Sequence, residues 1–197
     1  MTPPPTTRML IAYATDHGTT RQVAQAITEG AGDSEGCCAE ARDVEYLRSD
    51  DLRQVDALIL GAPVHMGGCH WAMKQFIDRI LGPLWASSEL EGRVGALFAT
   101  GSGRGGAGAG AELNMLSMLA VLAEMGMILV PLPHQTAGYE SGGLHWGPFF
   151  RTGVENGRPV LLDRDLTAAR RHGHRVALVT RQINPLHFGA SASREEP

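Results

Sequence analysis

The stretch Ile11-Ala-Tyr-Ala-Thr15-Asp-His-Gly18-Thr-Thr20 decides how the rest of the chain is read. It starts in an apolar run, breaks into small and hydroxyl-bearing residues around one glycine, and continues from Arg21 with apolar residues at helical spacing. This order predicts a strand, a tight loop and the start of a helix. Because the first N–H groups of a helix are unpaired and carry a partial positive charge, the loop is a candidate anion site.

Neutral donors dominate this loop. Thr15, Thr19 and Thr20 offer hydroxyl groups, and Gly18 allows a ligand to approach the backbone closely. The loop contains no lysine or arginine, because Arg21 only follows it. Such a loop suits a monophosphate better than a triphosphate. The alternative is an ordinary strand-to-helix turn in which the threonines cap the helix.

The composition is that of one globular domain. The chain has 197 residues, of which 43% are hydrophobic and 19% charged, enough for one α/β domain with a sizeable core. Its net charge of −4 does not predict the basic surface of a nucleic-acid-binding protein. Cys37, Cys38 and Cys69 form no disulfide framework, residues 1–7 lack a signal-peptide pattern, and no apolar run is long enough to span a membrane. We therefore expect a cytoplasmic protein with neither a nucleic-acid nor a membrane partner.

Strand and helix patterns alternate along a single domain, residues 8–184, which lies between a flexible leader at 1–7 and a disordered tail at 185–197. Strands are expected at 8–14, 37–44, 57–61, 93–99 and 127–132. Helices are expected at 19–31, at 50–52 as a short turn or helix, from about Met73 to a stop at Gly82-Pro83, at 111–125, and from a capping Asp163 to about Ile183. Residues 134–162 read as a long irregular segment rich in glycine, proline and aromatic residues.

This alternation predicts an α/β fold in which a five-stranded parallel sheet is covered by helices on both faces. Right-handed crossovers bring the carboxyl ends of the strands to one edge, where such sheets bind their ligands. Loops of unusual composition leave those ends at 15–20, 62–70 and 100–110. We expect these loops to converge on one site.

The helix expected at 111–125 is apolar on two opposite sides. Its stripes are Leu113, Leu116, Ala120 and Ala123 on one side, and Met115, Met118, Leu122 and Met125 on the other. A helix that is apolar all round is buried on both sides. The second side meets either another subunit or the segment 134–162.

Two motifs in the ligand loops suggest other chemistry. Gly101-Ser-Gly-Arg-Gly-Gly106 matches a dinucleotide fingerprint, but it follows the fourth strand, and no acidic residue ends the next one. His65, Cys69 and His70 suggest a metal site, but their spacing is no recognised zinc pattern. We therefore predict neither a dinucleotide fingerprint nor a metal. Of the three tryptophans near the loops, Trp85 and Trp146 are the better candidates for a substrate pocket.

Several blocks of the chain together resemble the flavodoxin-like NAD(P)H:quinone oxidoreductases of the tryptophan-repressor-binding-protein family. The resemblance covers nearly all of 8–183 and implies a three-layer flavodoxin-like sandwich with strand order 2-1-3-4-5. The blocks are Tyr13-Ala-Thr-Asp-His-Gly-Thr-Thr20, Gly61-Ala-Pro-Val-His-Met-Gly67, Met73-Lys-Gln-Phe-Ile-Asp78, Gly82-Pro-Leu-Trp-Ala-Ser87, Phe98-Ala-Thr-Gly-Ser-Gly103, Ala123-Glu-Met-Gly-Met-Ile-Leu-Val-Pro131 and Trp146-Gly-Pro148.

The resemblance implies FMN as cofactor and NADH or NADPH as co-substrate. The residues that would contact FMN are Thr15, Asp16, His17, Gly18, Thr19 and Thr20 at the phosphate, and Pro63, Val64, His65, Met66, Gly67, Thr100, Gly101, Ser102, Gly103 and Glu124 around the ring. The substrate side would be lined by Trp85, His17, His145 and Trp146. The chain departs from the family at His65-Met66, where Arg-Phe is common, and at Glu124, where the family has a histidine.

The implied activity is hydride transfer from NAD(P)H through FMN to a quinone, which leaves as the hydroquinone. The flavin supplies the chemistry, and His145 is a candidate proton donor to the quinone; an exposed loop histidine is the alternative. Competing functions are a flavodoxin-type carrier of single electrons, a nitro- or azo-reductase of the same fold, and an interaction protein that has lost its cofactor. A homodimer or homotetramer is expected.

Overall fold

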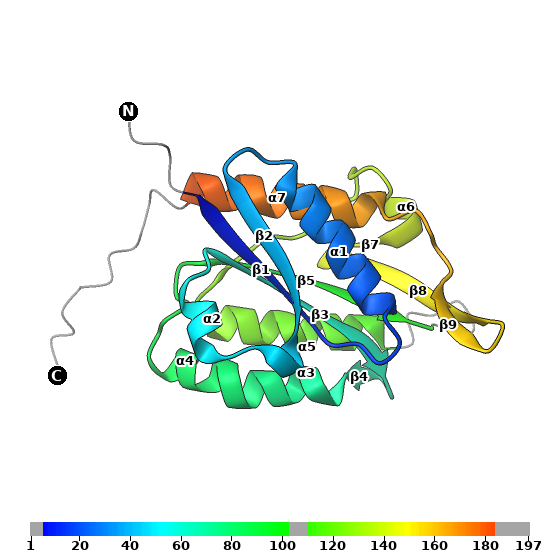
Figure 1. Ribbon diagram of the computed structural model, residues 1–197, viewed down its shortest axis with the longest axis horizontal. Helices are drawn as coiled ribbons and strands as arrows, with labels where there is room; N and C mark the ends of the chain where they lie inside the picture. The colour runs from blue at the N-terminus through cyan, green and yellow to red at the C-terminus, as the bar shows by residue number, and fades with distance from the viewer. Residues whose placement is uncertain (1–5, 103–109, 184–197) are drawn as a thin grey trace, which may run out of the picture.

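The computed structural model describes residues 6–102 and 110–183 and shows a twisted sheet between two layers of helices (Figure 1). The sheet order is β2-β1-β3-β5-β8-β7, with β4, β6 and β9 each paired to one strand of that path. The strands are β1 (Thr7–Tyr13), β2 (Cys37–Asp43), β3 (Ala57–His65), β4 (Gly68–Cys69), β5 (Val94–Gly101), β6 (Ile128–Leu129), β7 (Gly143–Leu144), β8 (Gly147–Glu155) and β9 (Arg158–Leu161).

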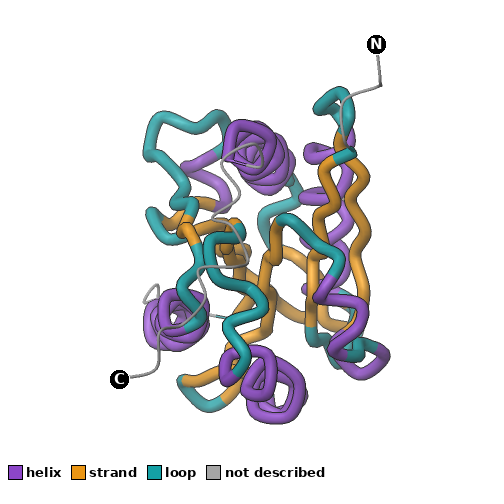
Figure 2. Tube along the Cα trace, turned by 90° about the vertical axis from the view of Figure 1, so that its left-hand side faces the viewer, coloured by secondary structure: helices purple, strands orange, loops and turns teal. Residues whose placement is uncertain are grey.

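The predicted flavodoxin-like sandwich is confirmed. Strands β2, β1, β3 and β5 pair in parallel in the expected order, and helices cover both faces of the sheet, as the end-on view in Figure 2 shows. The helical elements are α1 (Thr19–Gly32), η1 (Val44–Tyr46), α2 (Ser49–Arg53), α3 (Trp71–Phe76), the π-helical turn η2 (Ile77–Leu81), α4 (Gly82–Ala86), α5 (Ala111–Glu124), α6 (Tyr139–Gly142) and α7 (Thr167–Ile183).

Alternate residues of each central strand face opposite cores. In β1, Met9 and Ile11 pack toward α1 and α7, whereas Leu10 and Ala12 pack toward α3 and α5. All four side chains are almost fully buried. Because both faces of the sheet are covered, its strands read as continuous apolar runs rather than alternating ones.

Helices α1 and α7 pack closely because each has a glycine at the contact. A Cβ on Gly173 would lie 2.0 Å from the carbonyl oxygen of Ile27, and one on Gly30 would lie 1.9 Å from that of Arg170. Neither backbone can yield without moving its helix. This contact fixes how α1, and therefore the loop before it, sits on the sheet.

The segment 134–162 corrects the expectation of an irregular region. It contains α6, β7 and the antiparallel hairpin β8–β9, and β8 pairs in parallel with β5 from Ala99 to Gly101. The fifth strand expected at 127–132 shrinks to β6, which pairs only with Val94 and Gly95. The missed signal was Asn156-Gly157, whose positive φ values of 51° and 74° form the two-residue turn between Glu155 and Arg158.

Two expected helix boundaries are also wrong. The helix begun at Trp71 does not stop at Gly82-Pro83, because η2 shifts the backbone so that Pro83 falls in the first turn of α4, where its missing N–H is tolerated. The last helix begins at Thr167, whose N–H donates to Asp165, not at Asp163. Asp163 instead pairs with Arg151 of β8.

The methionine stripe of α5 packs on the sheet and is buried, comprising Met115, Met118, Leu122 and Met125. The opposite stripe is exposed, with Leu113 at 66% and Leu116 at 41% of full exposure. The segment 134–162 therefore does not cover it, which rules out that alternative for the single chain. Within the described ranges, no helix is long and apolar enough to cross a membrane.

Candidate functional site

The strand order reverses between β1 and β3, and at such a reversal open α/β sheets form a crevice at their carboxyl edge. The chain after β1 forms Thr15–Thr20, and that after β3 forms Met66-Gly67. Pro63 pairs with Thr100 in the ladder, which brings the end of β5 to the same edge. Ligands of open α/β sheets bind at such a reversal. The described parts of the three loops do converge, as predicted. Gly103 and the rest of 103–109 lie outside the residues that the structure describes.

The loop after β1 presents an open helix N-terminus. Gly18 is the N-cap of α1 with φ 86°, and the Thr15 hydroxyl accepts from the Gly18 N–H at 2.9 Å. The first helical bond is donated by Gln22, so the N–H groups of Thr19, Thr20 and Arg21 have no intrahelical partner. No acidic residue lies in this first turn. Both features suit an anion.

Arg21 changes the predicted neutral character of this loop. A terminal nitrogen of its guanidinium lies 3.3 Å from where a Cβ on Gly18 would stand. The side chain therefore folds back over the glycine instead of following the helix outward. A cation therefore stands beside N–H groups that have no intrahelical partner, which the sequence alone did not indicate.

Two of the threonines expected to contact FMN, one in this loop and one at the end of β5, have buried side chains. Thr20 and Thr100 are both fully buried, and their hydroxyl oxygens lie 2.9 Å apart in a hydrogen bond. This bond joins the first turn of α1 to the end of β5. Thr20 therefore places its backbone N–H in the loop while its hydroxyl ties two walls of the crevice together.

The loop after β3 is a tight hairpin. Val64 and His65 pair antiparallel with Cys69 and Gly68, and the two residues between them have positive φ, 48° at Met66 and 79° at Gly67. That is a type I′ turn, in which methionine is an uncommon first residue. The Met66 side chain is fully exposed. The turn thus holds His65 at the exit of β3, at the edge of the crevice.

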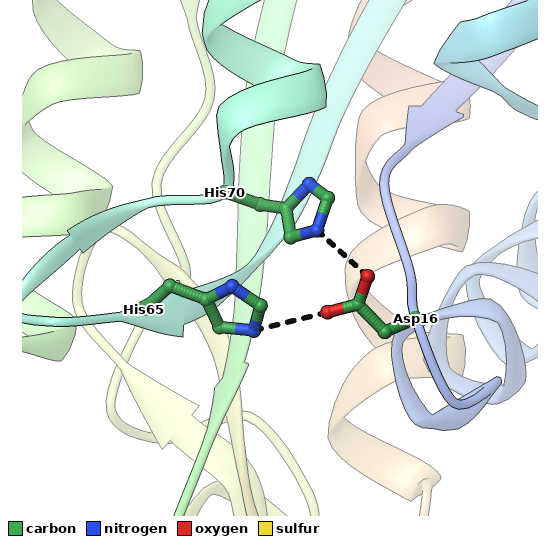
Figure 3. A group of neighbouring side chains, drawn as sticks. All are labelled: Asp16, His65 and His70. Carbon is green, nitrogen blue, oxygen red and sulfur yellow. Dashed lines mark hydrogen bonds and ion pairs between the residues drawn. The ribbon is translucent and has the colours of Figure 1, made fainter.

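Asp16, His65 and His70 converge across the crevice (Figure 3). One carboxylate oxygen of Asp16 lies 3.0 Å from Nε2 of His70, and the other lies 3.3 Å from Nε2 of His65. Asp16 follows β1, whereas the histidines come from the end of β3 and the N-cap of α3. The carboxylate therefore links the two loops at the reversal of strand order.

The hydrogen bonds of His70 define its protonation. Its Nδ1 accepts the N–H of Ala72 at 3.1 Å, so in the neutral ring the proton is on Nε2 and points at Asp16. A metal ligand would need the lone pair of Nε2, and a proton on Nδ1 would then oppose the Ala72 N–H. The three ligand atoms lie within 4.8 Å of one another, but this arrangement suits a hydrogen-bonded chain better than a metal.

Cys69 takes no part in this group. Its thiol is directed to the carbonyl oxygen of His70, and burial raises its pKa to about 12. The thiol stays protonated at neutral pH and is a poor metal ligand or nucleophile. The spacing in the sequence suggested Cys69 as the neighbour of His65 and His70. In the structure the third member of the group is Asp16, which is distant in the chain.

His65 is more exposed than the other histidine of the group, with 44% of its side chain accessible against 4% for His70. Burial lowers its pKa, the neighbouring His70 and His17 lower it further, and only Asp16 raises it. The ring of His65 also meets that of His70 edge-on, with the centroids 4.7 Å apart. His65 therefore favours its neutral form at pH 7, and Asp16 is the influence that favours protonation.

Trp85 and Glu124 lie away from these loops. They line a separate pocket of about 240 Å³ with residues of η2 and the end of α5, among them Ile77, Val121 and Met125. The start of α5 lies at the crevice, where Asn114 donates to the carbonyl of Ala62, and its end lies near Gly92, just before β5. Figure 1 accordingly shows α4 at the opposite end of the molecule from β4. One chain does not bring these two residues to the site.

His145 and Trp146 form the turn of the β7–β8 hairpin, with ring centroids 4.0 Å apart. His145 is exposed, and its carbonyl accepts from the N–H of Leu132. Ala99 of β5 pairs with Phe149, four residues after His145, so the histidine lies roughly 13 Å before that level of the sheet. In a single chain it is an exposed hairpin residue rather than part of the crevice.

Comparison with known proteins places the chain among flavodoxins. The flavodoxin domain family matches residues 10–111. A protein named flavodoxin from Aquifex aeolicus is 31% identical over 170 residues, covering 86% of this chain and 85% of that one. A protein named NAD(P)H dehydrogenase (quinone) from Archaeoglobus fulgidus is 31% identical over 200 residues, covering 89% of this chain and 98% of that one.

A solved structure agrees. The flavodoxin, WrbA-like protein from Agrobacterium tumefaciens superposes with a TM-score of 0.67 at 25% identity, over 89% of this chain and 98% of that one. The family match spans both loops at the reversal of strand order, where the candidate anion site and the hairpin lie. The chain therefore belongs to the flavodoxin family.

Proposed function

We propose that this protein is an FMN-dependent NAD(P)H dehydrogenase that reduces quinones by two electrons. The observation that carries the proposal is the N-terminus of α1 at the reversal of strand order, where the first N–H groups have no intrahelical partner and the first turn holds no acidic residue. Relatives named NAD(P)H dehydrogenase (quinone), such as the one from Archaeoglobus fulgidus, match the chain over 98% of their length and support the activity.

The residues present fit FMN. The N–H groups of Thr19, Thr20 and Arg21, with the Arg21 guanidinium, suit the phosphate, because they combine unpaired donors with positive charge. The hairpin at Met66-Gly67 and the chain around the end of β5, from Thr100 to Ser102, would flank the ring. When bound, FMN accepts and delivers hydride, and the chain supplies position and electrostatics.

Substrate residues and assembly are part of the same proposal. Trp85, Glu124, His145 and Trp146 do not reach the crevice of their own chain, so they serve a site only if another copy carries them there. The exposed leucine stripe of α5 is the surface on which we expect that contact. We therefore propose a homodimer or homotetramer, with NADH or NADPH and the quinone using the crevice in turn.

A flavodoxin-type electron carrier is the second candidate, favoured by the 31% identity to the flavodoxin from Aquifex aeolicus. It would bind FMN through the same loops but exchange single electrons with a protein. The segment 134–162, which forms β7, β8 and β9, extends the sheet and favours the enzyme over the carrier.

One experiment separates these functions. The purified protein is reconstituted with FMN, its visible spectrum is recorded, and NADH or NADPH is added anaerobically before benzoquinone. We expect a yellow protein that a nucleotide bleaches and benzoquinone restores, with catalytic turnover of both. A protein that takes up no FMN contradicts the flavoprotein proposal, and a yellow protein that neither nucleotide bleaches identifies the carrier.

A further inference from the structure

We propose that Asp16 is a positioning residue that holds His65 as the proton-exchanging side chain of this site. The inference rests on the proposed quinone reduction, because that reaction needs a proton. Two-electron reduction of a quinone adds one hydride and one proton. The hydride derives from NAD(P)H, and the proton would leave the imidazolium of His65, which then regains one from water. In a single chain His145 lies outside the crevice, so another side chain has to donate this proton.

His70 is the most buried side chain of the group formed by Asp16, His65 and His70. His70 is only 3% exposed, and it is held from both sides: Nδ1 accepts from Ala72, and Nε2 donates to Asp16. Because the α3 backbone sets the ring of His70, this histidine fixes the first oxygen of the Asp16 carboxylate. Asp16 is therefore anchored although it stands in an exposed loop.

The second oxygen of Asp16 lies 3.3 Å from Nε2 of His65, close enough for an ion pair with the protonated ring. Because a carboxylate accepts but cannot donate, we expect this contact to favour the tautomer of His65 that carries its proton on Nε2. Nδ1 of His65 then keeps its lone pair, and within residues 6–102 and 110–183 the structure gives it no hydrogen-bond partner. A nitrogen of this kind can take up and release a proton at the edge of the crevice.

The position of His65 suits this task. It closes β3 immediately before the type I′ turn, beside the loop after β1, and about 44% of its side chain is exposed to solvent. It is thus connected to water for reprotonation. The charged and titratable groups that face it are Asp16, His70 and His17, and only Asp16 favours its protonated form.

The first test uses the protein without FMN, so that it does not depend on the proposed function. Long-range ¹H–¹⁵N NMR assigns the tautomer and pKa of each histidine. We expect Nε2–H tautomers for His65 and His70, and a lower pKa for His65 in Asp16→Asn. Asp50→Asn, which removes an equal charge from α2, should leave the His65 pKa unchanged. An Nδ1–H tautomer of His65, or no shift in Asp16→Asn, would overturn the proposal.

The same samples test the metal alternative. Addition of one equivalent of Zn²⁺ should leave the ring signals of His70 in place, because its Nε2 carries a proton and its Nδ1 is occupied. Stoichiometric loss or shift of both His65 and His70 signals, abolished in Asp16→Asn, would show a metal site instead of a proton-exchanging pair.

The second test uses the FMN-loaded protein and separates the two half-reactions by stopped flow. In His65→Gln, bleaching by NAD(P)H should keep its rate, whereas reoxidation by benzoquinone should slow by about 10²-fold. Reoxidation in the natural protein should accelerate as pH falls through the His65 pKa; His65→Gln should lose this dependence, and Asp16→Asn should shift it to lower pH. Imidazole should partly rescue His65→Ala.

His174→Gln is the matched control, because His174 lies in α7 and contacts Ser34. It should leave both half-reactions unchanged. Equal slowing of both half-reactions in His65→Gln would show a structural role only and overturn the proposal. A protein that is never bleached by NAD(P)H contradicts the proposed function itself, and the NMR result without FMN then still reports whether Asp16 holds His65.

Discussion

At the residue scale, His172 shows how one buried group makes stability depend on pH. The imidazole lies fully buried in α7, and among the described residues neither ring nitrogen has a hydrogen-bond partner of good geometry. Burial, and then the nearby Arg175 cation, lower its pKa to about 3, and the backbone of Leu97 opposes this only weakly. Between pH 6.5 and about 3, the folded protein therefore holds His172 neutral whereas the unfolded chain protonates it.

The resulting prediction is a loss of stability in acid. Above pH 6.5 the ring is neutral in both states and has no effect. As pH falls from 6.5 toward 3, only the unfolded state binds the proton, so the free energy of unfolding drops by up to about 1.4 kcal/mol per pH unit. Urea titrations between pH 7 and pH 4, common buffer conditions, should show a shallower drop for His172→Leu. A slope equal to that of the His174→Gln control would contradict this account.

Gly18 is the second residue whose role is specific. An alanine there would take a left-handed φ of 86°, at a cost of about 1–2 kcal/mol, and its Cβ would lie 3.3 Å from the Arg21 guanidinium, which would have to shift. We predict that Gly18→Ala weakens FMN binding by tenfold or more, since a charge-assisted hydrogen bond is worth about 1.5–3 kcal/mol. Fluorescence titration with FMN measures this.

Gly36→Ala is the control for that prediction. Gly36 has a comparable φ of 73°, but nothing lies within 4 Å of the added Cβ. It should lose similar stability and keep its FMN affinity. Equal FMN affinities for Gly18→Ala and the natural protein would show that the phosphate lies elsewhere.

At the scale of elements, the contact of α1 with α7 sets the position of the proposed anion site on the sheet. We predict that Gly173→Ala costs about 1–3 kcal/mol or more, because its Cβ meets the rigid carbonyl of Ile27 at 2.0 Å. Gly32→Ala, at the end of α1 with open space around it, should instead gain up to about 1 kcal/mol from a less flexible unfolded chain. Thermal unfolding followed by circular dichroism compares the two. Similar melting temperatures would show that the helices move apart without cost.

The same scale explains which element boundaries were predictable. Strands β1, β3 and β5 and helix α1 were expected within a few residues, because their apolar runs reflect burial on both faces of the sheet. The hairpin β8–β9 was missed although Asn156-Gly157 is a strong local turn signal, because the flanking residues do not alternate clearly. The passage of the helix through Gly82-Pro83 was missed because a π-helical turn has no signature in composition.

At the scale of the whole molecule, the exposed stripe of α5 concerns assembly. Leu113 and Leu116 stand in solvent in the single chain. We predict that the protein sediments as a dimer or tetramer and that Leu113→Lys with Leu116→Lys converts it to a monomer, because two buried charges would stand in the interface. Sedimentation velocity measures this, with Val154→Lys in the exposed part of β8 as control. A natural protein that is monomeric at all concentrations would contradict the proposal.

The position of the candidate site in the fold could be predicted from the sequence, but most of the side-chain contacts within it could not. The loops around Gly18, Met66 and Thr100 were expected together because parallel strands end at one edge. The sequence did not show that Arg21 folds back over Gly18, that Thr20 pairs with Thr100, or that Trp85 and Glu124 lie at the far edge. These relations depend on side-chain direction and on which way each helix returns across the sheet.

Hydrophobic periodicity is a local property, so the α/β class could be predicted from the sequence alone. The order of the central strands came from the resemblance to a known family, and loop composition indicated the edge of the sheet where we expect a ligand. Only the tertiary structure decided that Asp16, His65 and His70 form one group. Asp16 and His70 are 54 residues apart in the chain and 3.0 Å apart in space. Contacts of that kind arise from the reversal of strand order, which brings the loops after β1 and β3 face to face, and no local pattern encodes them.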